Sequence, residues 1–302
     1  MALASFSSSA KIFKGAKSSS RVAWILMAPG LAYLALFFIT PFILLILTSL
    51  GEQSTSGLNQ TFSYGFNLGN YLPLVADNLP NVLRSFGYAL VATVAALVIG
   101  YPLAYFIGVK LRSRPLLQRL TITLVIAPFF ISFLLRTLAW TQIFSNAGPV
   151  VTFLQDLGIM QTGDRILGTP FAVIFGLTYN FIPFMTLPLY TSLEKLDIRY
   201  LEAGADLYAN PRRVFFKVTL PLSMPGVISG TLLTFIPMAG DYVNASKNYL
   251  GGAQTSMLGN IIEAEYKNFN YPVASALSVG LMAIILILIV GYVRRVGSEE
   301  LL

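Results

Sequence analysis

The sequence predicts an all-α integral membrane protein with six membrane-spanning helices. Of its 302 residues, 55% are hydrophobic and only 11% are charged, whereas a soluble globular protein carries about 25% charged residues. Six apolar stretches come close to or exceed the roughly 20 residues that a helix needs to cross a bilayer. They run over residues 23–50, 83–109, 120–144, 169–192, 225–243 and 272–293.

The six stretches predict a single membrane domain over residues 23–295. A basic tail, residues 1–22, precedes it, and a short tail, residues 296–302, follows it. The apolar run after Arg21 is too long for a signal peptide, and no small-residue cleavage site follows it. We therefore expect the first apolar stretch to be retained as a spanning helix.

The distribution of Lys and Arg predicts the orientation. Fifteen of them fall in the N-terminal tail, in the loops after the second and fourth spans, and in the C-terminal tail, against four in the remaining loops. The positive-inside rule then places both termini in the cytoplasm. The opposite loops carry more acids than bases, which either attracts cations or simply mirrors the same rule.

Small residues and prolines recur inside the spans. The second span has one small residue every four positions, and the fifth repeats the pattern, so both should let a neighbouring helix approach closely. These residues are Ala92, Ala96, Gly100, Ala104, Gly108, Gly226 and Gly230. Prolines that should interrupt and bend their helices favour a transporter over a rigid scaffold; they are Pro41, Pro102, Pro128, Pro183, Pro188 and Pro237.

The composition also excludes several chemistries. The chain has no Cys and no His, so thiol metal sites, imidazole bases and Ser-His-Asp triads are excluded. It has no Gly-x-x-x-x-Gly-Lys-Ser/Thr loop that could hold the phosphates of ATP. We expect no catalytic residue, no metal site and no cofactor on this chain.

The loop between the fourth and fifth spans, residues 197–221, predicts a pair of short helices. Asp197 is a candidate N-cap, and an apolar face follows it at helical spacing, formed by Ile198, Leu201, Ala205 and Tyr208. Asn210 and Pro211 can start a second helix, which Leu220–Pro221 should end. The spacing leaves two roles open, namely docking into another protein or lying on the lipid surface.

This loop resembles the EAA loop of binding-protein-dependent ATP-binding cassette importers. Glu202, Ala203 and Gly204 open the pattern, Tyr208 follows four residues later, and Val218, Leu220 and Pro221 close it. Gly204 stands where the pattern has a third Ala, and Tyr208 where it has Gly. The resemblance implies a type I (MetI-like) permease whose loop docks in a cleft of a cytoplasmic ATPase subunit. The implied coupling residues are Glu202, Ala203, Gly204, Asp206, Leu207, Tyr208 and Asn210.

Three further strings resemble the spermidine/putrescine permeases: "APFFISFLLRTLAW" (127–140), "FIPFMTLPLYTSLEKLD" (181–197) and "LGGAQTSMLGNIIEAEYKNFNYPVASALS" (250–278). The resemblance implies a bacterial inner-membrane subunit with four kinds of partner: a second permease, two ATPase subunits that bind ATP and Mg, an outer solute-binding protein and a polyamine. Another cargo such as a sugar, an anion or a metal chelate stays open. So do an ion-driven transporter and a non-transporting scaffold.

A polyamine would need carboxylates for its ammonium groups and aromatic faces for its methylenes. Asp241, next to Tyr242, is the first candidate, because it follows Pro237 and Gly240 where the fifth span should break; a solvated position beyond the helix is the alternative. Arg136 could pair with Asp241 or extend to the interface. Further pathway candidates, for which packing or solvated positions are the alternatives, are Trp140, Tyr179, Asn180 and, on an outer helical segment starting near Thr255, Glu263 and Glu265.

Overall fold

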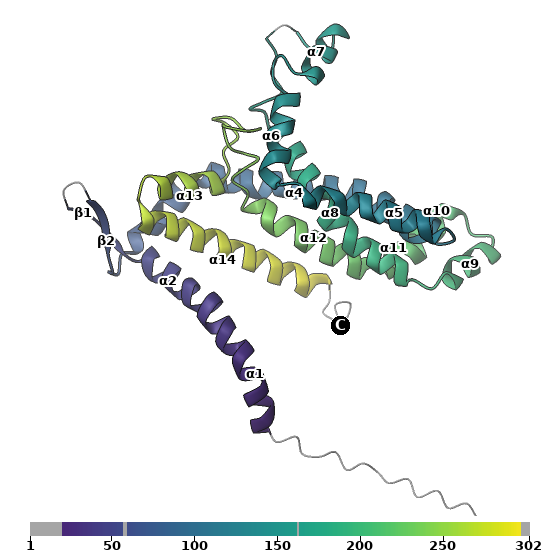
Figure 1. The fold of residues 1–302 in the computed structure, drawn as a ribbon, viewed down its shortest axis with the longest axis horizontal. Helices are drawn as coiled ribbons and strands as arrows, with labels where there is room; N and C mark the ends of the chain where they lie inside the picture. Colours follow the sequence, from purple (N-terminus) through teal and green to yellow (C-terminus); the bar gives the residue numbers. More distant parts are fainter. Residues whose placement is uncertain (1–19, 57–58, 162, 297–302) are drawn as a thin grey trace, which may run out of the picture. The chain divides into compact units, whose positions relative to one another are not determined.

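The computed structural model describes residues 20–56, 59–161 and 163–296 (Figure 1). The predicted tail 1–22 thus lies almost wholly outside the described residues, as does the tail 296–302 beyond its first residue. The chain divides into two units, residues 1–47 and 48–302. The described part is helical apart from one antiparallel hairpin, β1 (Glu52–Ser56) and β2 (Asn59–Ser63), in which Glu52 pairs with Ser63.

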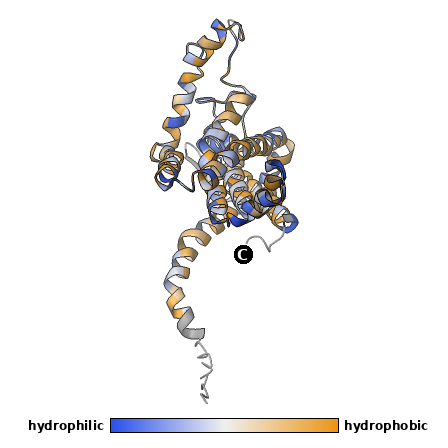
Figure 2. Cartoon of the chain, turned by 90° about the vertical axis from the view of Figure 1, so that its right-hand side faces the viewer, coloured by the Kyte–Doolittle hydropathy of each residue, from blue (hydrophilic) through white to orange (hydrophobic). Residues whose placement is uncertain are grey.

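The first unit is a helical segment. It consists of α1 (Ser20–Leu34), a π-helical turn (Ala35–Ile39) and the start of α2 (Thr40–Ser49). The Thr40 hydroxyl donates to the carbonyl oxygen of Ala35 at 3.1 Å and so supports the wide turn. Apolar side chains are exposed along it, and hydrophobic residues predominate there in Figure 2, as expected of a helix that needs lipid around it.

The second unit is built around α8 (Pro170–Lys195), which packs against α4 (Leu79–Tyr105) on one side and α12 (Met224–Ala239) on another (Figure 1). The predicted small-residue ladder lies in these contacts. A Cβ added at Gly226 would lie 2.6 Å from the Cβ of Ser192 and 2.8 Å from the carbonyl oxygen of Pro188. A Cβ at Gly230 would lie 3.1 Å from the carbonyl oxygen of Met185. The absence of side chains at these glycines therefore sets the spacing between α8 and α12.

The remaining elements of this unit surround that core. In chain order they are a 3₁₀ turn (Leu68–Tyr71), α3 (Leu72–Ala76), a π turn (Phe106–Lys110), α5 (Pro115–Ile126), a 3₁₀ turn (Ala127–Phe130), α6 (Phe133–Ile143), α7 (Pro149–Asp156), α9 (Arg199–Asp206), α10 (Pro211–Val214), a π turn (Phe215–Thr219), α11 (Leu220–Leu222), α13 (Leu258–Lys267) and α14 (Tyr271–Val296). Figure 1 places α9 and α10 at one end of the α4–α8–α12 core and α13 toward the other.

Within the described residues, four helical segments are long and apolar enough to span a membrane: Trp24–Ser49, Leu79–Lys110, Pro170–Lys195 and Tyr271–Arg295. Two bent pairs bring the number to as many as six. They are Pro115–Phe130 with Phe133–Ile143, bent by 91°, and Pro211–Leu222 with Met224–Ala239, bent by 65°. The predicted set of six spans is thus consistent with the structure, but two of the spans are not straight helices.

The structure corrects three expectations about the course of the spans. The third span is not continuous over 120–144, because Ile131 and Ser132 have extended ψ values of 135° and 136° after a 3₁₀ turn that contains Pro128. The fifth span ends at Ala239 rather than 243, and the hairpin before it bends at Ser223 rather than stopping at Pro221. At Pro102, Pro183 and Pro188 the expected interruption is absent. The helix α4 continues through Pro102, and α8 continues through Pro183 and Pro188.

We expect Gly226→Ala to lower the free energy of unfolding by about 1–3 kcal/mol, since the added methyl would overlap backbone and Cβ atoms of α8. The matched control is Gly87→Ala on α4, where an added Cβ meets nothing within 4 Å. The thermal midpoint of the detergent-purified chain measures both. Equal midpoints for Gly226→Ala and the wild-type protein would show that the α8–α12 contact is not limited by this glycine.

Candidate functional site

The loop between α8 and α12 forms the predicted helical hairpin, and Asp197 caps its first helix. The Asp197 carboxylate accepts from the backbone N–H of Arg199 at 3.0 Å and forms an ion pair with the Arg199 guanidinium at 2.6 Å. The side-chain hydrogen bond from Arg199 is the main reason that the pKa of Asp197 lies below its ordinary value. The cap is therefore ionised at neutral pH, and the predicted N-cap is confirmed.

The first helix of the hairpin ends in a left-handed turn at Tyr208, whose φ is 52°. Ala209 N donates to the carbonyl oxygen of Gly204 at 3.1 Å, which is the six-residue closure of a Schellman motif. Glycine suits this backbone best, so the structure gives a reason for Gly at this place in the EAA pattern. The prediction that Tyr208 continues the apolar face of Ile198 and Leu201 is wrong, because its side chain is 98% exposed.

The second helix of the hairpin starts as predicted and packs closely on the first. Asn210 Oδ1 accepts from Arg212 N at 3.1 Å, and Pro211 is the first helical residue. A Cβ at Gly204 would lie 3.0 Å from Cγ2 of Val214. In this chain Val214 therefore occupies the space that the third Ala of the pattern would use.

The tip of the hairpin presents exposed side chains of mixed character. Glu202, Ala203, Asp206 and Asn210 are exposed, and Leu207 is exposed with Tyr208. Gly204 is half-buried against α10. The structure thus brings all seven predicted coupling residues to one short hairpin with an apolar tip beside two carboxylates.

Both ends of the hairpin are tied to the helical core. The Arg112 guanidinium, just after α4, donates to the carbonyl oxygen of Leu196 at 2.8 Å. The buried hydroxyls of Tyr101 on α4 and Ser223 between α11 and α12 share a hydrogen bond of 2.7 Å. The hairpin is therefore connected to the helical core by direct hydrogen bonds at both of its ends.

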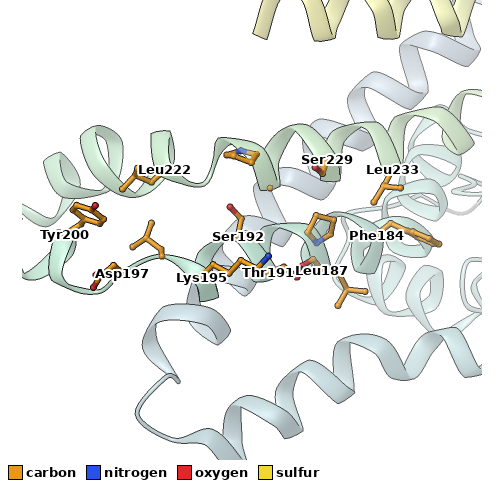
Figure 3. A pocket seen from close by; sticks show the side chains of 14 residues that line it. Phe184, Leu187, Thr191, Ser192, Lys195, Asp197, Tyr200, Leu222, Ser229 and Leu233 are labelled. Atoms are coloured by element: carbon orange, nitrogen blue, oxygen red, sulfur yellow. Dashed lines mark hydrogen bonds between the residues drawn. The ribbon is translucent and has the colours of Figure 1, made fainter. Parts of the chain in front are cut away.

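A groove of about 790 Å³ lies between the hairpin end of α8 and the α11–α12 segment (Figure 3). Its walls are mostly apolar, and its polar side chains include Thr191, Ser192, Ser229, Lys195 and Asp197. Sequence reasoning did not identify this groove. Hydroxyl side chains in apolar helices commonly serve helix packing. Only the packing of α8 against α12 shows that the hydroxyls of Thr191, Ser192 and Ser229 line the same groove.

At the opposite end of α8, a buried polar network contains Asp241 and Asn180. The Asp241 carboxylate accepts from Asn244 N at 2.8 Å, from Asn244 Nδ2 at 3.0 Å and from Ala245 N at 3.4 Å. Asn180 Nδ2 donates to Asn244 Oδ1 at 3.1 Å and to Thr137 Oγ1 at 3.2 Å. Asp241 is 7% exposed, and its carboxylate orients Asn244. The Asn244 side chain in turn links the loop after α12 to α8 and α6.

Trp140, Tyr179 and Arg136 lie beside this network. The Trp140 ring packs edge-on against Phe175 and Tyr179, with centroids 4.6 and 5.2 Å apart. The Arg136 guanidinium carbon lies 5.7 Å from the centroid of Phe133. Among the described residues, ion pairs join Arg199 to Asp197 and Lys267 to Glu263, so the structure does not form the suggested pair between Arg136 and Asp241.

The other three candidates lie apart from the network. Tyr242 is half exposed, and its carbonyl oxygen accepts from Asn260 Nδ2 at 2.6 Å. Glu263 and Glu265 lie on α13, which begins at Leu258. Glu263 pairs with Lys267, and Glu265 accepts from Asn270 Nδ2 at 2.8 Å.

Comparison with known proteins connects this arrangement to a family. Residues 96–296, more than half of the chain, match the model of the "binding-protein-dependent transport system inner membrane component". The chain belongs to this family. It is therefore a multi-pass inner-membrane permease, the translocation subunit of an importer.

The permease is similar in sequence to two proteins that share one name, and similar in fold to a solved transporter structure. It is 38% identical to the "spermidine/putrescine transport system permease protein PotB" of Haemophilus influenzae, over 87% of this chain and 90% of that protein. It is also 38% identical to the protein of the same name from Escherichia coli, over 87% and 93% of the two chains. The permease superposes on a chain of the inward-facing MetNI methionine ABC transporter with a TM-score of 0.57 and 23% identity, over 74% and 96% of the two chains, which confirms the fold.

We expect Tyr208→Gly to stabilise the end of α9 by about 1 kcal/mol, because a left-handed backbone costs a residue with a Cβ about 1–2 kcal/mol. Hydrogen exchange at the Ala209 amide should slow, since this amide closes the Schellman turn. Leu207→Gly, at a position without a positive φ, is the control and should speed exchange. Faster exchange in Tyr208→Gly would show that the tyrosine side chain, not the backbone, stabilises the turn.

We expect Asp241→Asn to loosen the loop after α12 by about 1–3 kcal/mol, because an amide cannot accept all three hydrogen bonds and leaves a buried donor unpaired. Amide exchange at Asn244 and Ala245 should accelerate, whereas the exposed Asp156→Asn should leave it unchanged. Unaltered exchange at both amides would contradict the structural role of this carboxylate.

Proposed function

We propose that this permease is one of two membrane subunits of an ATP-driven polyamine importer. The hairpin over residues 197–221 carries the coupling part of the proposal, because it exposes a short capped helix while its ends are tied to α4 and α12. The names of relatives 38% identical to this chain support spermidine and putrescine as the cargo class.

In the proposed mechanism, two ATPase subunits on the cytoplasmic side bind ATP and Mg and receive the hairpins of the two permeases. Closure of the ATPase pair displaces Glu202–Asn210. The hydrogen bonds at Leu196 and Ser223 then pass the displacement to the core helices, and the solute path alternates between its two openings. No bond of the solute is made or broken on this chain.

The orientation in the proposal follows from charge. The hairpin and the loop after α4 carry many of the basic residues, so this end is assigned to the cytoplasm. The groove beside Thr191, Ser192 and Ser229 is then the cytoplasmic mouth of the path. Its hydroxyls can replace water around a cation without binding it tightly.

The outer half of the path is assigned to the region around Trp140, Tyr179, Asn180 and Asp241. The rings of Trp140 and Tyr179 offer faces for methylenes and ammonium groups. Asp241 stays a candidate ammonium ligand, but its carboxylate would first have to exchange its loop donors for the amine. Tyr242 on the following loop, and Glu263 and Glu265 on α13, are assigned to the entrance where an outer binding protein would deliver the solute.

The proposal is tested with the purified assembly of both permeases, the ATPase subunits and the binding protein in lipid nanodiscs. Spermidine or putrescine with the binding protein should stimulate ATP hydrolysis, whereas a sugar, an inorganic anion or a metal chelate should not. Stimulation by one of these other solutes alone would overturn the polyamine assignment and leave the importer class intact.

We expect Glu202→Arg to uncouple the importer, lowering uptake about tenfold or more while ATP hydrolysis continues. The reason is that a bulky cation replaces an exposed carboxylate on the docking helix without disturbing the buried core. Asp156→Arg on α7, an exposed acid far from the hairpin in the sequence, is the control and should leave uptake unchanged. Wild-type uptake in Glu202→Arg would argue against docking through this helix.

A further inference from the structure

The second half of the hairpin carries a cluster of exposed cations. Arg212 and Arg213 on α10 are exposed, as is Lys217 on the π turn that follows. Phe216, on the same turn, is 64% exposed. Because residues three or four positions apart lie on one side of a helix, these four side chains form one surface, here called the basic face.

The basic face is not neutralised by either of the ion pairs that the described residues form. The exposed acids of the hairpin, Glu202 and Asp206, lie on the other helix, α9. The two halves of the hairpin therefore present opposite charges and suit different partners, and a partner of the basic face has to be anionic.

Aromatic packing on the helical core fixes the level of the basic face. The Phe215 ring packs edge-on against Tyr101 and Tyr105 of α4, with centroids 5.4 and 6.3 Å apart, and the Phe216 ring packs on Phe215 at 5.0 Å. The two tyrosines lie near the end of Leu79–Lys110, a segment long and apolar enough to span the membrane. The basic face is therefore held at the level where that segment leaves the membrane.

The bend before α12 keeps the basic face at this level. The segment Pro211–Leu222 is bent by 65° from α12, so each of its residues advances only about 0.6 Å along the axis of α12. From Ser223 to Arg212 the advance is about 7 Å, whereas a straight helix would cover about 17 Å. With α12 crossing the bilayer, the basic face runs along the membrane boundary.

An anionic lipid matches both components of the basic face. Phosphate oxygens accept charge-assisted hydrogen bonds from guanidinium and ammonium groups, and the acyl boundary covers an exposed aromatic ring. Clustered Lys and Arg beside a membrane helix attract anionic headgroups. The carboxylates of Glu202 and Asp206 would be repelled by the same headgroups, so α9 is not the half of the hairpin that suits this surface.

We propose that the basic face binds the phosphate headgroups of anionic lipids in the leaflet on the hairpin side, with Phe216 at the acyl boundary. Protein docking and lipid binding, both compatible with the spacing of this loop, are then divided between its two halves: α9 docks, and α10 with its π turn lies on lipid. The lipid site requires neither a polyamine nor an ATPase subunit, so it goes beyond the proposed function.

The first test identifies the partner of Phe216. Phe216→p-benzoylphenylalanine is introduced into the full assembly in nanodiscs of phosphatidylethanolamine and phosphatidylglycerol, and the products of irradiation are identified by mass spectrometry. A lipid adduct is expected. Tyr208→p-benzoylphenylalanine, at the 98% exposed tip, is the comparison and should label an ATPase subunit. An ATPase adduct without a lipid adduct from position 216 would overturn the lipid site.

The second test removes charge from the basic face. In the purified assembly, Arg212→Gln with Lys217→Gln should raise the phosphatidylglycerol concentration needed for half-occupancy, measured by native mass spectrometry, about tenfold or more. Binding of neutral phosphatidylcholine should not change. The matched control, Arg165→Gln with Lys247→Gln, also removes one exposed Arg and one exposed Lys and should leave half-occupancy unaltered. An unchanged value in the first variant, or an equal rise in the control, would contradict the proposal.

A third measurement needs no variant and decides if the charge variant fails to assemble. Amide exchange over residues 211–219 should be slower in nanodiscs that contain phosphatidylglycerol than in phosphatidylcholine alone, while exchange over α13 stays the same. Equal exchange over 211–219 in both lipids would overturn the site. A lipid adduct from position 216 without an ATPase adduct from position 208 would support the lipid site and contradict the proposed docking of α9.

Discussion

The structure depends on the close approach of α8 and α12, which is possible because Gly226 and Gly230 have no side chains. In lipid there is no hydrophobic force to hold two apolar helices together, so contact must come from packing at short range. These two helices are also the ones that the hairpin joins. A tightly packed pair transmits displacement, because packed side chains shift between discrete arrangements and do not deform smoothly.

Local features of this arrangement were predictable from the sequence. The small-residue ladder was visible because helical spacing places every fourth residue on one face. The caps at Asp197 and Asn210 were predictable because a cap needs only a side chain and the amides that follow it. The environment of Tyr208 was predicted wrongly. An aromatic residue at helical spacing is compatible with an apolar helix face, and the sequence does not show that the backbone is already left-handed at this residue.

Long-range features were not predictable in the same way. Residues 120–144 form one predominantly apolar stretch, and composition alone does not reveal that the chain turns by 91° within them. The network of Thr137, Asn180 and Asn244 joins residues 43 and 64 positions apart, so no local pattern contains it. The sequence predicted a break of the fifth span just before Asp241, and α12 does end at Ala239. The partners of the Asp241 carboxylate could not be predicted, because they depend on how the following loop folds back.

Asp241 and Arg136 show how differently two buried charges can be accommodated. The carboxylate is satisfied by donors three and four residues ahead of it, so its environment is complete within one chain. The guanidinium lies on a helix whose own backbone donors and acceptors are already paired, and a cation can be satisfied only by an acceptor that another segment brings. In the described part of the chain the Asp241 carboxylate thus has its donors within one loop, whereas Nε and Nη1 of Arg136 have no hydrogen-bond partner.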